Sequence, residues 1–561
     1  MLKDRKRVPA WLALLLAFAL VGAACGGDGD DGGGGGGGED GEAQTGGAFT
    51  MSLCEPEFLI PQQDNETCGG QVLHTLFTPL VLFDAEDSTE TFDGAVGESI
   101  ETEDQQTWTV TLKDGWTFHD GTPVTSESFV SAWNWAAYGP NIAGNSYFFA
   151  NVEGYDDLQC ELNEAGDKCV KDPKTEEMSG LKVIDDLTFE VKLISPFSQF
   201  PLTVGYNAFY PLPEAFFDDP DAFNDQPIGN GPYQMAGPWK HNQEITVEKF
   251  EDYAGDPGNA DEITFKIYGE DALNAAYRDL QAGNVDVLDS IPPQQIEAAK
   301  SAFGDAFIES PSSSFTYLGF PLYQKEWEDP NLRHAFSMAI DRQAIIDAIF
   351  FGTLTPSASV VSPVVKGSRP DACGEHCQYD PEAAKQLWDE AGGNELFGDG
   401  LTLWFNNDGG HEEWMEAVKN QLQQNLGIEK VTFESFVFEE YLGKLDAEEA
   451  TGPFRLGWVM DYPSPQNYLE PIYSTEGSSN NFGYSNSEVD DLIKQGNEAP
   501  SIDDGITFYN QAEDIILEDM PVAPMWFGLN QTVHSDRIQN VVVDAFSFIR
   551  LEDVEVVDQS A

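Results

Sequence analysis

The 561-residue chain carries 98 aspartate and glutamate residues against 28 lysine and arginine residues, a formal net charge of −70 at neutral pH. This charge argues against nucleic acid as a partner, because phosphate backbones attract basic surfaces, and against binding to anionic lipid faces for the same reason. It is typical of a solvated surface adapted to salt or tuned for solubility, so it identifies no acidic partner.

The N-terminus has the three parts of a secretory signal. Four basic residues stand between positions 3 and 7, an apolar run covers residues 11–20, and small residues at 22–24 precede Cys25. The apolar run is too short to cross a bilayer, which takes about 20 residues. We expect residues 1–24 to be removed and Cys25 to be lipidated, because a cysteine directly after small residues resembles the lipobox of bacterial lipoproteins. Gly22 departs from that pattern, which prefers a large aliphatic residue there, so plain secretion is the alternative.

Residues 25–47 consist mostly of glycine, aspartate and glutamate. Such a segment has little apolar surface to bury, which leaves nothing to offset the entropy lost on ordering. A glycine-rich phosphate-binding loop requires a strand before it and a helix after it, and neither is present. We therefore predict a flexible, lipid-anchored tether.

Cysteine usage fits an exported protein. Without Cys25, six cysteines are left, an even number that indicates disulfides in an oxidising compartment. Six cysteines allow 15 pairings. Proximity in the chain favours Cys54–Cys68, Cys160–Cys169 and Cys373–Cys377. A metal site at 373–377, with His376 beside Cys377, is the alternative, but zinc needs four ligands and no second cluster supplies them.

Strands and helices are mixed along the rest of the chain. Period-two alternation predicts strands, as at 107–113, where Trp108, Val110 and Leu112 share one face. Apolar residues three and four apart predict helices, as after the cap residues Thr125 and Ser126. In chain order we predict a strand at 107–113, a helix that includes 129–136, strands at 187–193, 244–249 and 262–268, and helices at 330–352, 381–391, 414–426, 489–493 and 508–517.

Residues 48–561 are too many for a single hydrophobic core, so we expect two or more lobes. Mixed strands and helices without a fixed-length repeat predict an α/β or α+β fold. No glycine- or proline-rich linker divides this part of the chain. Lobes that exchange the chain more than once, with a cleft between them, explain this pattern better than domains in series.

No strong catalytic motif is present. Residues 411–415 begin like the zinc-protease helix motif, but Met415 stands where the second histidine is required. A Gly-x-Ser-x-Gly elbow does not occur. Paired carboxylates suit a glycosidase, but with 98 acidic residues such pairs arise by chance. We predict a protein that is not an enzyme and has no catalytic residues, cofactor or metal.

Several blocks of sequence resemble the peptide/nickel-type (family 5) solute-binding proteins of ABC importers, and most closely the oligopeptide-binding members. The blocks occur in the family's order across nearly all of the mature chain, and this order makes the resemblance specific. The matching blocks are 112–125 with the helix at 129–133, 227–233, 252–253, 260–268, 280–288, 331–341, 457–463 and 520–526.

The resemblance implies a periplasmic-binding-protein-like type II fold, with two hinged α/β lobes and an extra small lobe. We expect lobe I at 48–80, 200–313 and 525–561, the extra small lobe (lobe II) at 81–199, and lobe III at 314–524. Such lobes close over a ligand by hinge motion, and the closed form docks on a membrane permease. We expect a monomer on the extracytoplasmic face of a bacterial cell membrane.

The resemblance also implies candidate ligand-binding residues. Asp461, in the Gly-Trp-Val-Met-Asp-Tyr-Pro block, matches an aspartate that pairs with the peptide α-ammonium; the alternative is a loop aspartate that caps a turn. Trp458 matches a pocket tryptophan, with a core role as alternative. Arg455 matches an arginine that meets the peptide carboxylate in some members, with a structural role as alternative. Tyr147 is a further pocket candidate, because 144–149 falls near the cleft.

Other positions depart from the oligopeptide binders. Phe438 stands in place of a second pocket tryptophan, and Leu445 replaces another carboxylate-binding arginine. These changes leave peptide length and carboxylate anchoring open. We predict an oligopeptide receptor of an ABC importer. The alternatives are an oligosaccharide, a metal chelate or another cationic solute on the same scaffold, or, from another class, a secreted hydrolase.

Overall fold

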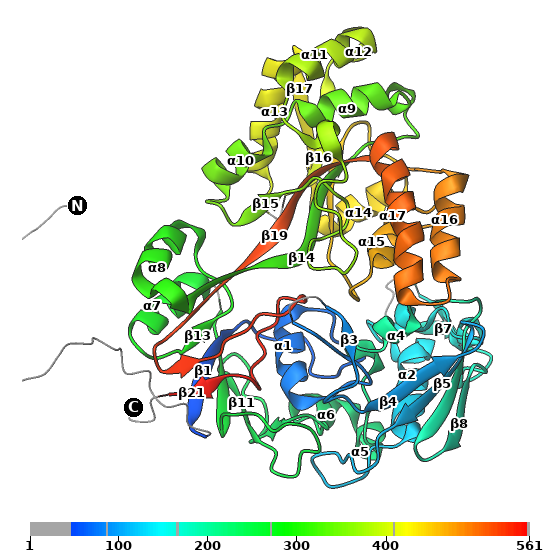
Figure 1. The fold of residues 1–561 in the computed structure, drawn as a ribbon, viewed down its shortest axis with the longest axis vertical. Helices are drawn as coiled ribbons and strands as arrows, with labels where there is room; N and C mark the ends of the chain where they lie inside the picture. The colour runs from blue at the N-terminus through cyan, green and yellow to red at the C-terminus, as the bar shows by residue number, and fades with distance from the viewer. Residues whose placement is uncertain (1–45, 86–87, 164–167, 270–271, 408–409, 558–561) are drawn as a thin grey trace, which may run out of the picture. The chain divides into compact units, whose positions relative to one another are not determined.

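The computed structural model describes residues 46–85, 88–163, 168–269, 272–407 and 410–557, all within one compact unit (Figure 1). The predicted signal peptide, Cys25 and the tether as far as residue 45 lie outside the described residues. At Gly46 the backbone N–H donates to the Asn259 carbonyl oxygen at 2.7 Å, and the Gly47 N–H donates to the Asp261 carboxylate at 2.9 Å. None of the helices in the described ranges combines the length and apolar character of a membrane-spanning segment.

The largest sheet has eleven strands and runs through most of the described chain. Strand β1 pairs in parallel with β12 and β13, and β16 pairs in parallel with β17 and β18, whereas the other pairs are antiparallel. In sheet order the strands are β10 (Tyr233–Met235), β11 (Glu244–Lys249), β12 (Glu262–Ile267), β1 (Ala48–Leu53), β13 (Val287–Leu288), β19 (Val522–His534), β14 (Phe307–Gly319), β18 (Phe454–Trp458), β16 (Leu401–Asn406) and β17 (Val431–Phe436), with β15 (Leu354–Pro356) paired to β19.

Strands β14 and β19 connect the two halves of this sheet. Each has thirteen residues, and Figure 1 shows them running side by side from the β1 half to the half that contains β16 and β17. Their register shifts between Pro311 and Phe315. Gly528 lies opposite this shift, where a Cβ atom would stand 2.2 Å from the Ser314 Oγ. The shift contains the boundary predicted between lobe I and lobe III, although the hinge itself stays a prediction.

A second, four-stranded sheet forms in the segment predicted as lobe II. Its order is β4 (Gly97–Thr102), β5 (Thr107–Leu112), β9 (Thr188–Lys192) and β8 (Leu181–Asp185). Helix α2 (Ser126–Ala137) covers it and starts at a capping box between Thr125 and Ser128. Trp133 of α2 and Met51 of β1 are both fully buried in one continuous hydrophobic cluster. The segments predicted as lobes I and II therefore share a core.

The other elements of the N-terminal half are short. Helix α1 follows β1 and is capped by Glu66, whose carboxylate accepts from the Cys68 and Gly69 N–H groups. The elements are α1 (Thr67–Leu76), β2 (Leu82–Phe83), β3 (Glu90–Thr91), α3 (Tyr155–Leu158), β6 (Glu161–Leu162), β7 (Cys169–Lys171), α4 (Phe200–Thr203), α5 (Glu214–Asp218), α6 (Pro220–Asp225), α7 (Ala272–Gln281) and α8 (Ile296–Phe303), and at the C-terminus β20 (Ile538–Gln539) pairs with β21 (Glu555–Val556).

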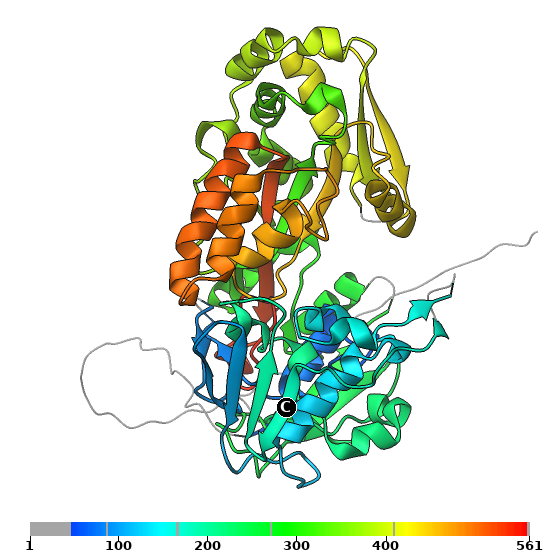
Figure 2. The same cartoon turned by 90° about the vertical axis from the view of Figure 1, so that its right-hand side faces the viewer.

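The segment predicted as lobe III is rich in helices and has its own hydrophobic cluster. Figures 1 and 2 show α16 and α17 packed side by side beside the strands. The helices are α9 (Pro330–Met338), α10 (Arg342–Ile349), α11 (Pro381–Glu390), α12 (Gly393–Leu396), α13 (Glu412–Leu426), α14 (Phe438–Asp446), α15 (Pro465–Tyr473), α16 (Ser487–Asn497) and α17 (Ile502–Asp519).

One helix prediction is wrong. The apolar pattern from Pro330 to Gly352 predicts a single helix, but the chain forms α9 and α10 with a break at 339–341. The Asp341 carboxylate accepts from the Ala344 N–H at 3.0 Å and so caps a new helix. The apolar residues keep a buried face on both sides of the break because both helices pack on the same core.

The predicted lobes II and III touch through a small polar contact. Ser198 donates from its N–H to the Asn497 carbonyl oxygen (2.6 Å) and from its hydroxyl to the Gly496 carbonyl oxygen (2.9 Å). The Ser464 hydroxyl donates to the Gln199 side-chain oxygen at 2.8 Å. These bonds lie away from β14 and β19, so two separate regions link the lobes.

The six cysteines form the three pairs that chain proximity favours. Cys54–Cys68 joins the residue after β1 to α1, Cys160–Cys169 lies at the β6–β7 pair, and Cys373–Cys377 spans a single turn. The disulfide takes both thiols of the alternative metal site at 373–377, and the described residues contain no cluster of three His, Cys, Asp or Glu side chains suited to a metal ion.

We predict that the Cys54–Cys68 disulfide contributes more stability than Cys160–Cys169. It closes the longer loop, with a sequence separation of 14 against 9, and Cys68 is buried in the shared core. Replacing both Cys54 and Cys68 with serine should lower the free energy of unfolding by about 3 kcal/mol. Urea denaturation of both double variants measures the difference, and a larger loss in the Cys160–Cys169 variant would contradict the prediction.

Candidate functional site

Three of the predicted ligand-binding residues line one cavity. Tyr147, Trp458 and Asp461 surround a space of about 170 Å³, which we call the Asp461 cavity. Its other lining residues are mostly apolar or aromatic: Phe148, Asn151, Val152, Leu193, Phe197, Phe200, Thr203, Phe209, Tyr462, Asn467, Pro471 and Ser478. An apolar and aromatic wall with a few placed polar groups is typical of a small-molecule site.

The loop that holds Asp461 is fixed by one amide side chain. Asn467, in the first turn of α15, accepts through its Oδ1 from the Asp461 N–H (2.9 Å) and from the Trp458 Nε1–H (3.2 Å). Its Nδ2 donates to the Asp461 carboxylate at 3.0 Å. Ser464 caps α15, because its hydroxyl accepts from the Gln466 N–H. Ser464, and not Asp461, is therefore the residue that caps α15.

The Asp461 carboxylate has no cationic partner among the described residues. It is half-buried, and burial raises its pKa to about 6, while the hydrogen bond from Asn467 acts in the opposite direction. The hydroxyls of Tyr147 and Tyr206 lie within its field, since burial and the charge of Asp461 raise the pKa of both groups. The site therefore holds a carboxylate whose charge is poorly compensated.

Arg455 and Phe438 are not among the residues that line this cavity. Arg455 lies on β18, donates from Nη1 to the Asn406 side-chain oxygen at 3.4 Å, and has no hydrogen-bond acceptor at Nε in the described chain. Burial lowers the pKa of Arg455. Phe438 is the first residue of α14 and is 42% exposed, and Leu445, on the same helix, is buried in the core.

The sequence analysis did not identify Asn467 or Phe148 as residues of this site. Asn467 lies six residues beyond Asp461, and a helix-start asparagine carries no signal of its own for ligand binding. Phe148 follows Tyr147, and its ring stacks on the Tyr147 ring at 4.4 Å between centroids. Only the fold brings Asn467 and Phe148 to the same cavity.

A second cavity, of about 180 Å³, lies next to the first. We call it the Phe548 cavity. Its lining comes from five separate chain segments, at 64–83, 205–210, 313, 459–460 and 544–552. No motif in the sequence predicts this cavity, because its lining is assembled from segments that lie far apart in the chain.

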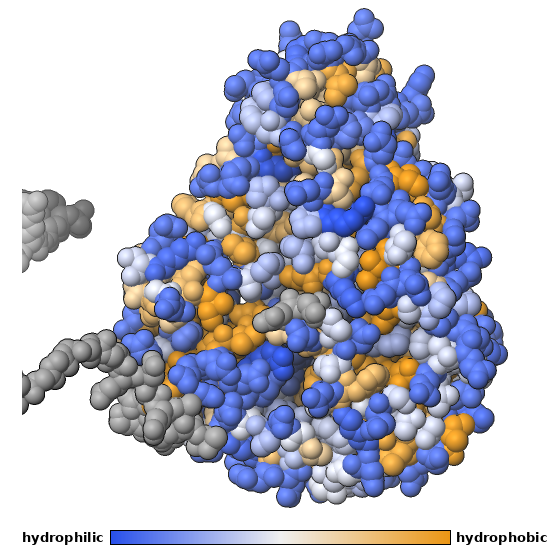
Figure 3. All heavy atoms as spheres, in the orientation of Figure 1, coloured by the Kyte–Doolittle hydropathy of each residue, from blue (hydrophilic) through white to orange (hydrophobic). Residues whose placement is uncertain are grey.

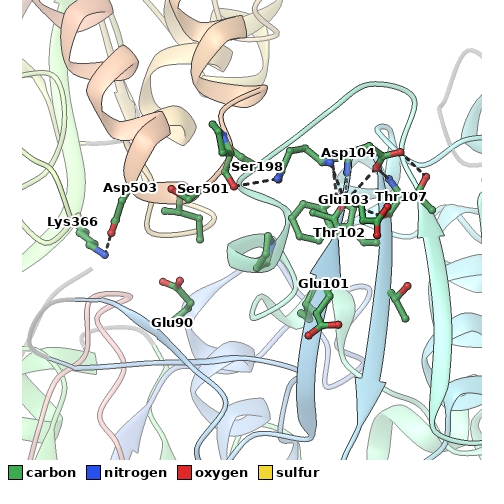
Figure 4. A pocket seen from close by; sticks show the side chains of 17 residues that line it. Glu90, Glu101, Thr102, Glu103, Asp104, Thr107, Ser198, Lys366, Ser501 and Asp503 are labelled. Carbon is green, nitrogen blue, oxygen red and sulfur yellow. Dashed lines mark hydrogen bonds and ion pairs between the residues drawn. The ribbon is translucent and has the colours of Figure 1, made fainter.

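A larger groove of about 910 Å³, which we call the polar groove, lies between the β4–β5 turn and the start of α17 (Figure 4). Figure 4 shows the Lys366–Asp503 ion pair (2.7 Å) on one side and the turn at Asp104 on the other. The Asp104 carboxylate accepts from the Gln106 and Thr107 N–H groups, and these bonds lower its pKa. Asp104, Lys366 and Asp503 are paired locally, and Glu101 and Glu103 are exposed to solvent, so this groove fits a solvated surface better than a ligand site. Hydrophilic residues also predominate on the face of the molecule that Figure 3 shows.

Comparison with known proteins identifies the family of this scaffold. Residues 91–480 match the family described as bacterial extracellular solute-binding proteins, family 5 Middle, which is more than half of the chain. The chain belongs to the family 5 extracellular solute-binding proteins. Members of this family are transport binding proteins and not enzymes.

The relatives cover nearly the whole chain. The oligopeptide-binding protein OppA of Bacillus subtilis (strain 168) is 27% identical over 555 residues, 95% of this chain and 96% of OppA. The dipeptide-binding protein DppE of the same strain is 25% identical over 463 residues, 80% of this chain and 81% of DppE. The unliganded open form of the periplasmic murein tripeptide-binding protein MppA has a TM-score of 0.78 at 22% identity, covering 92% of this chain and 99% of that chain. These likenesses confirm the predicted α/β type II fold.

We predict that Asp461→Asn makes the ligand-free protein more stable at pH 7. The folded pKa of Asp461 is about 6, above the unfolded value of 3.8, so the folded state loses stability as pH rises through this window. Asparagine keeps the shape and the bond to Asn467 without the charge, so the gain should be about 1–2 kcal/mol after allowance for partial exposure. Urea denaturation measures it.

The gain should vanish near pH 3, below both pKa values, because the Asp461 carboxyl then binds a proton in the folded and in the unfolded state. Asn467→Ala is the matched comparison: it removes the amide that holds the loop, and should lower stability at both pH values. A loss of stability in Asp461→Asn at pH 7 would show that the aspartate has a structural role instead.

Proposed function

We propose that this protein is an exported, lipid-anchored receptor that captures short peptides between its lobes and delivers them to an ABC permease. The observation that carries the proposal is the Asp461 carboxylate, which is half-buried among tyrosines, held in place by Asn467, and without a cation beside it. Burying a charge without a partner costs folding free energy. The Asp461 carboxylate therefore indicates a cationic partner that arrives with the ligand.

A peptide α-ammonium fits this position chemically. It supplies a positive charge and N–H donors to a carboxylate already aligned by Asn467, and charge-assisted hydrogen bonds of this kind are among the strong ones. Trp458 and Tyr147 line the same cavity and offer aromatic walls to the first side chain of the peptide.

The relatives support peptides as the solute class. OppA, DppE and MppA are named for binding oligopeptides, dipeptides and a murein tripeptide respectively. Peptides of every length share one α-ammonium, so an anchor at Asp461 suits a family whose members differ in peptide length. Arg455 as a carboxylate anchor and Phe438 as a pocket residue stay predictions, because neither lines the Asp461 cavity.

We predict that binding requires a free N-terminus. Trialanine should bind, whereas N-acetyl-trialanine and the Asp461→Asn variant with trialanine should each lose at least a hundredfold in affinity, because the ammonium–carboxylate pair is removed from one side or the other. Affinity for trialanine should fall about tenfold for each pH unit below about 6, as Asp461 takes up a proton in the free protein. Isothermal titration calorimetry measures all three effects.

Glu103→Gln is the matched control, because it neutralises an exposed carboxylate in the polar groove, and it should bind trialanine like the wild type. Equal affinity for free and acetylated peptides would contradict the proposal that Asp461 binds the peptide ammonium. Mass spectrometry of the ligand that copurifies with the native protein then distinguishes a peptide from an oligosaccharide, a metal chelate or another cation.

We also predict that Cys25 anchors the protein. In the native host, the wild type should sediment with membranes and incorporate labelled palmitate. Cys25→Ser should be released in soluble form and still bind trialanine, because the folded residues are unchanged. A wild-type protein found free in the medium would favour the alternative of plain secretion.

A further inference from the structure

The Asp461 cavity and the Phe548 cavity meet at the loop after β18. Trp458 and Asp461 line the first cavity, whereas Val459, between them in sequence, lines the second. Tyr206 lines the Phe548 cavity, and its ring lies 4.5 Å between centroids from that of Phe148 in the Asp461 cavity. A ligand held at Asp461 therefore has its next groups beside the Phe548 cavity.

Aromatic rings form much of the wall of the Phe548 cavity. The Phe548 ring lies 4.3 Å from His74, and the Phe546 ring lies 5.5 Å from Phe83, measured between centroids. Burial lowers the pKa of His74 to about 4, so this imidazole is neutral at pH 7. Such a wall accepts an aliphatic chain and also favours a cation placed against the ring faces.

The same cavity has more carboxylic acids than cations. Its acidic lining residues are Asp64, Glu66, Asp544 and Glu552, and Arg550 is the one lysine or arginine among the described lining residues. The Arg550 Nε lies 3.4 Å from Glu552 and 3.2 Å from the Asp553 carboxylate, so it is already paired. Glu66 is occupied by the N–H groups of α1. Asp544 lies within the field of Arg550, and its Oδ1 accepts from the Phe546 and Phe548 N–H groups at 2.9 Å. Asp64 is left without a cation.

Two of the polar side chains that line the cavity are buried and unsatisfied. Asp64 is 1% exposed; its Oδ2 accepts from the Asn207 amide at 2.9 Å, but no well-formed hydrogen bond from the described chain reaches its Oδ1, and the Glu66 carboxyl beside it adds to the rise of its pKa. Ser313 is also 1% exposed, and its hydroxyl has no partner there. Unpaired buried polar atoms are uncommon in native proteins, and at the wall of a cavity they are free to bond to a ligand.

The carboxylic acids lie near one another. Burial is the main cause of the raised pKa of Tyr210, and the charges of Asp544, Asp64 and Glu552 add to it, so all three lie within electrostatic reach of one hydroxyl. Burial raises the pKa of Asp64 to about 9 and that of Asp544 to about 7. At neutral pH the Asp64 carboxyl therefore holds a proton that a cation would displace.

We propose that the Phe548 cavity binds a cationic side chain of the ligand, an aliphatic stem ending in an ammonium or guanidinium, which makes the receptor selective for peptides with lysine or arginine. The stem packs on Phe548 and Phe546, and the charge lies between Asp64 and Asp544, with Ser313 as a further acceptor. The anchor at Asp461 fixes which residue of the peptide places its side chain in the Phe548 cavity, so this inference rests on the proposed function.

The first test changes the charge of one peptide side chain and keeps its aliphatic stem. Trialanine is substituted at each of its three positions with lysine or with norleucine, which keeps the stem and lacks the ammonium, and affinities are measured by calorimetry. At one position the lysine peptide should bind at least tenfold more tightly. Asp544→Asn should reduce this ratio, and Glu101→Gln, which neutralises an exposed carboxylate of the polar groove, should keep both the ratio and the norleucine affinity of the wild type.

Calorimetry in buffers of different ionisation enthalpy gives a second readout. The lysine peptide should release protons on binding at pH 7.5, and the norleucine peptide should not. Asp64→Asn should abolish the release; because Asp64 is buried, its norleucine affinity reports whether the variant is correctly folded. Norleucine peptides that bind as tightly as lysine peptides at all three positions would overturn the proposal.

A third arm is independent of peptides. In the Asp461→Asn background, n-butylammonium should give ligand-observed NMR saturation transfer, n-butanol should give less, and adding Asp544→Asn should remove the difference. If trialanine peptides fail to bind but n-butylammonium behaves in this way, the peptide function is wrong and the cation site is supported. Equal signals from n-butylammonium and n-butanol would overturn the cation site.

Discussion

The pairing of β14 with β19 is the constraint on which the rest of the structure depends. These two strands belong to both halves of the eleven-stranded sheet, so they connect the segment predicted as lobe III to the one predicted as lobe I, and the polar contact at Ser198 is a further link to the segment predicted as lobe II. The register shift between Pro311 and Phe315, opposite Gly528, interrupts this pairing midway. Ser313, inside the interruption, also lines the Phe548 cavity, so the proposed site and the proposed hinge share residues.

The carboxylates of the two cavities have different surroundings from those on the surface. Most of the acidic residues that give the chain its charge of −70 lie where water solvates them and cost little. Asp461 and Asp64 are exceptions, since burial raises the pKa of both and neither faces a cation in the described chain. Carboxylates in such positions weaken the empty protein, and their presence is easiest to understand if the ligand brings the missing positive charge.

Asn467 shows how a receptor keeps such a charge in place. One amide accepts from the backbone of Asp461 and the ring of Trp458 and donates to the Asp461 carboxylate, so one helix-start residue orients two candidate ligand-binding side chains. Because α15 is itself capped by Ser464 and is largely buried, the geometry exists before a ligand arrives. Preorganisation of this kind reduces the entropy lost on binding.

The sequence by itself determined the family and most of the secondary structure. It favoured the three disulfide pairs that form, and its resemblance to the family pointed to three residues that line the Asp461 cavity. It could do so because collinear motifs, hydrophobic period and cysteine proximity are local or ordered along the chain. It predicted one helix where α9 and α10 form, because a continuous apolar face hides the cap at Asp341. Only the tertiary structure decided that Arg455 and Phe438 stand apart from that cavity, that lobes I and II share a core, and that five distant segments enclose the Phe548 cavity. Those outcomes depend on contacts between residues far apart in the chain, and no local pattern encodes them.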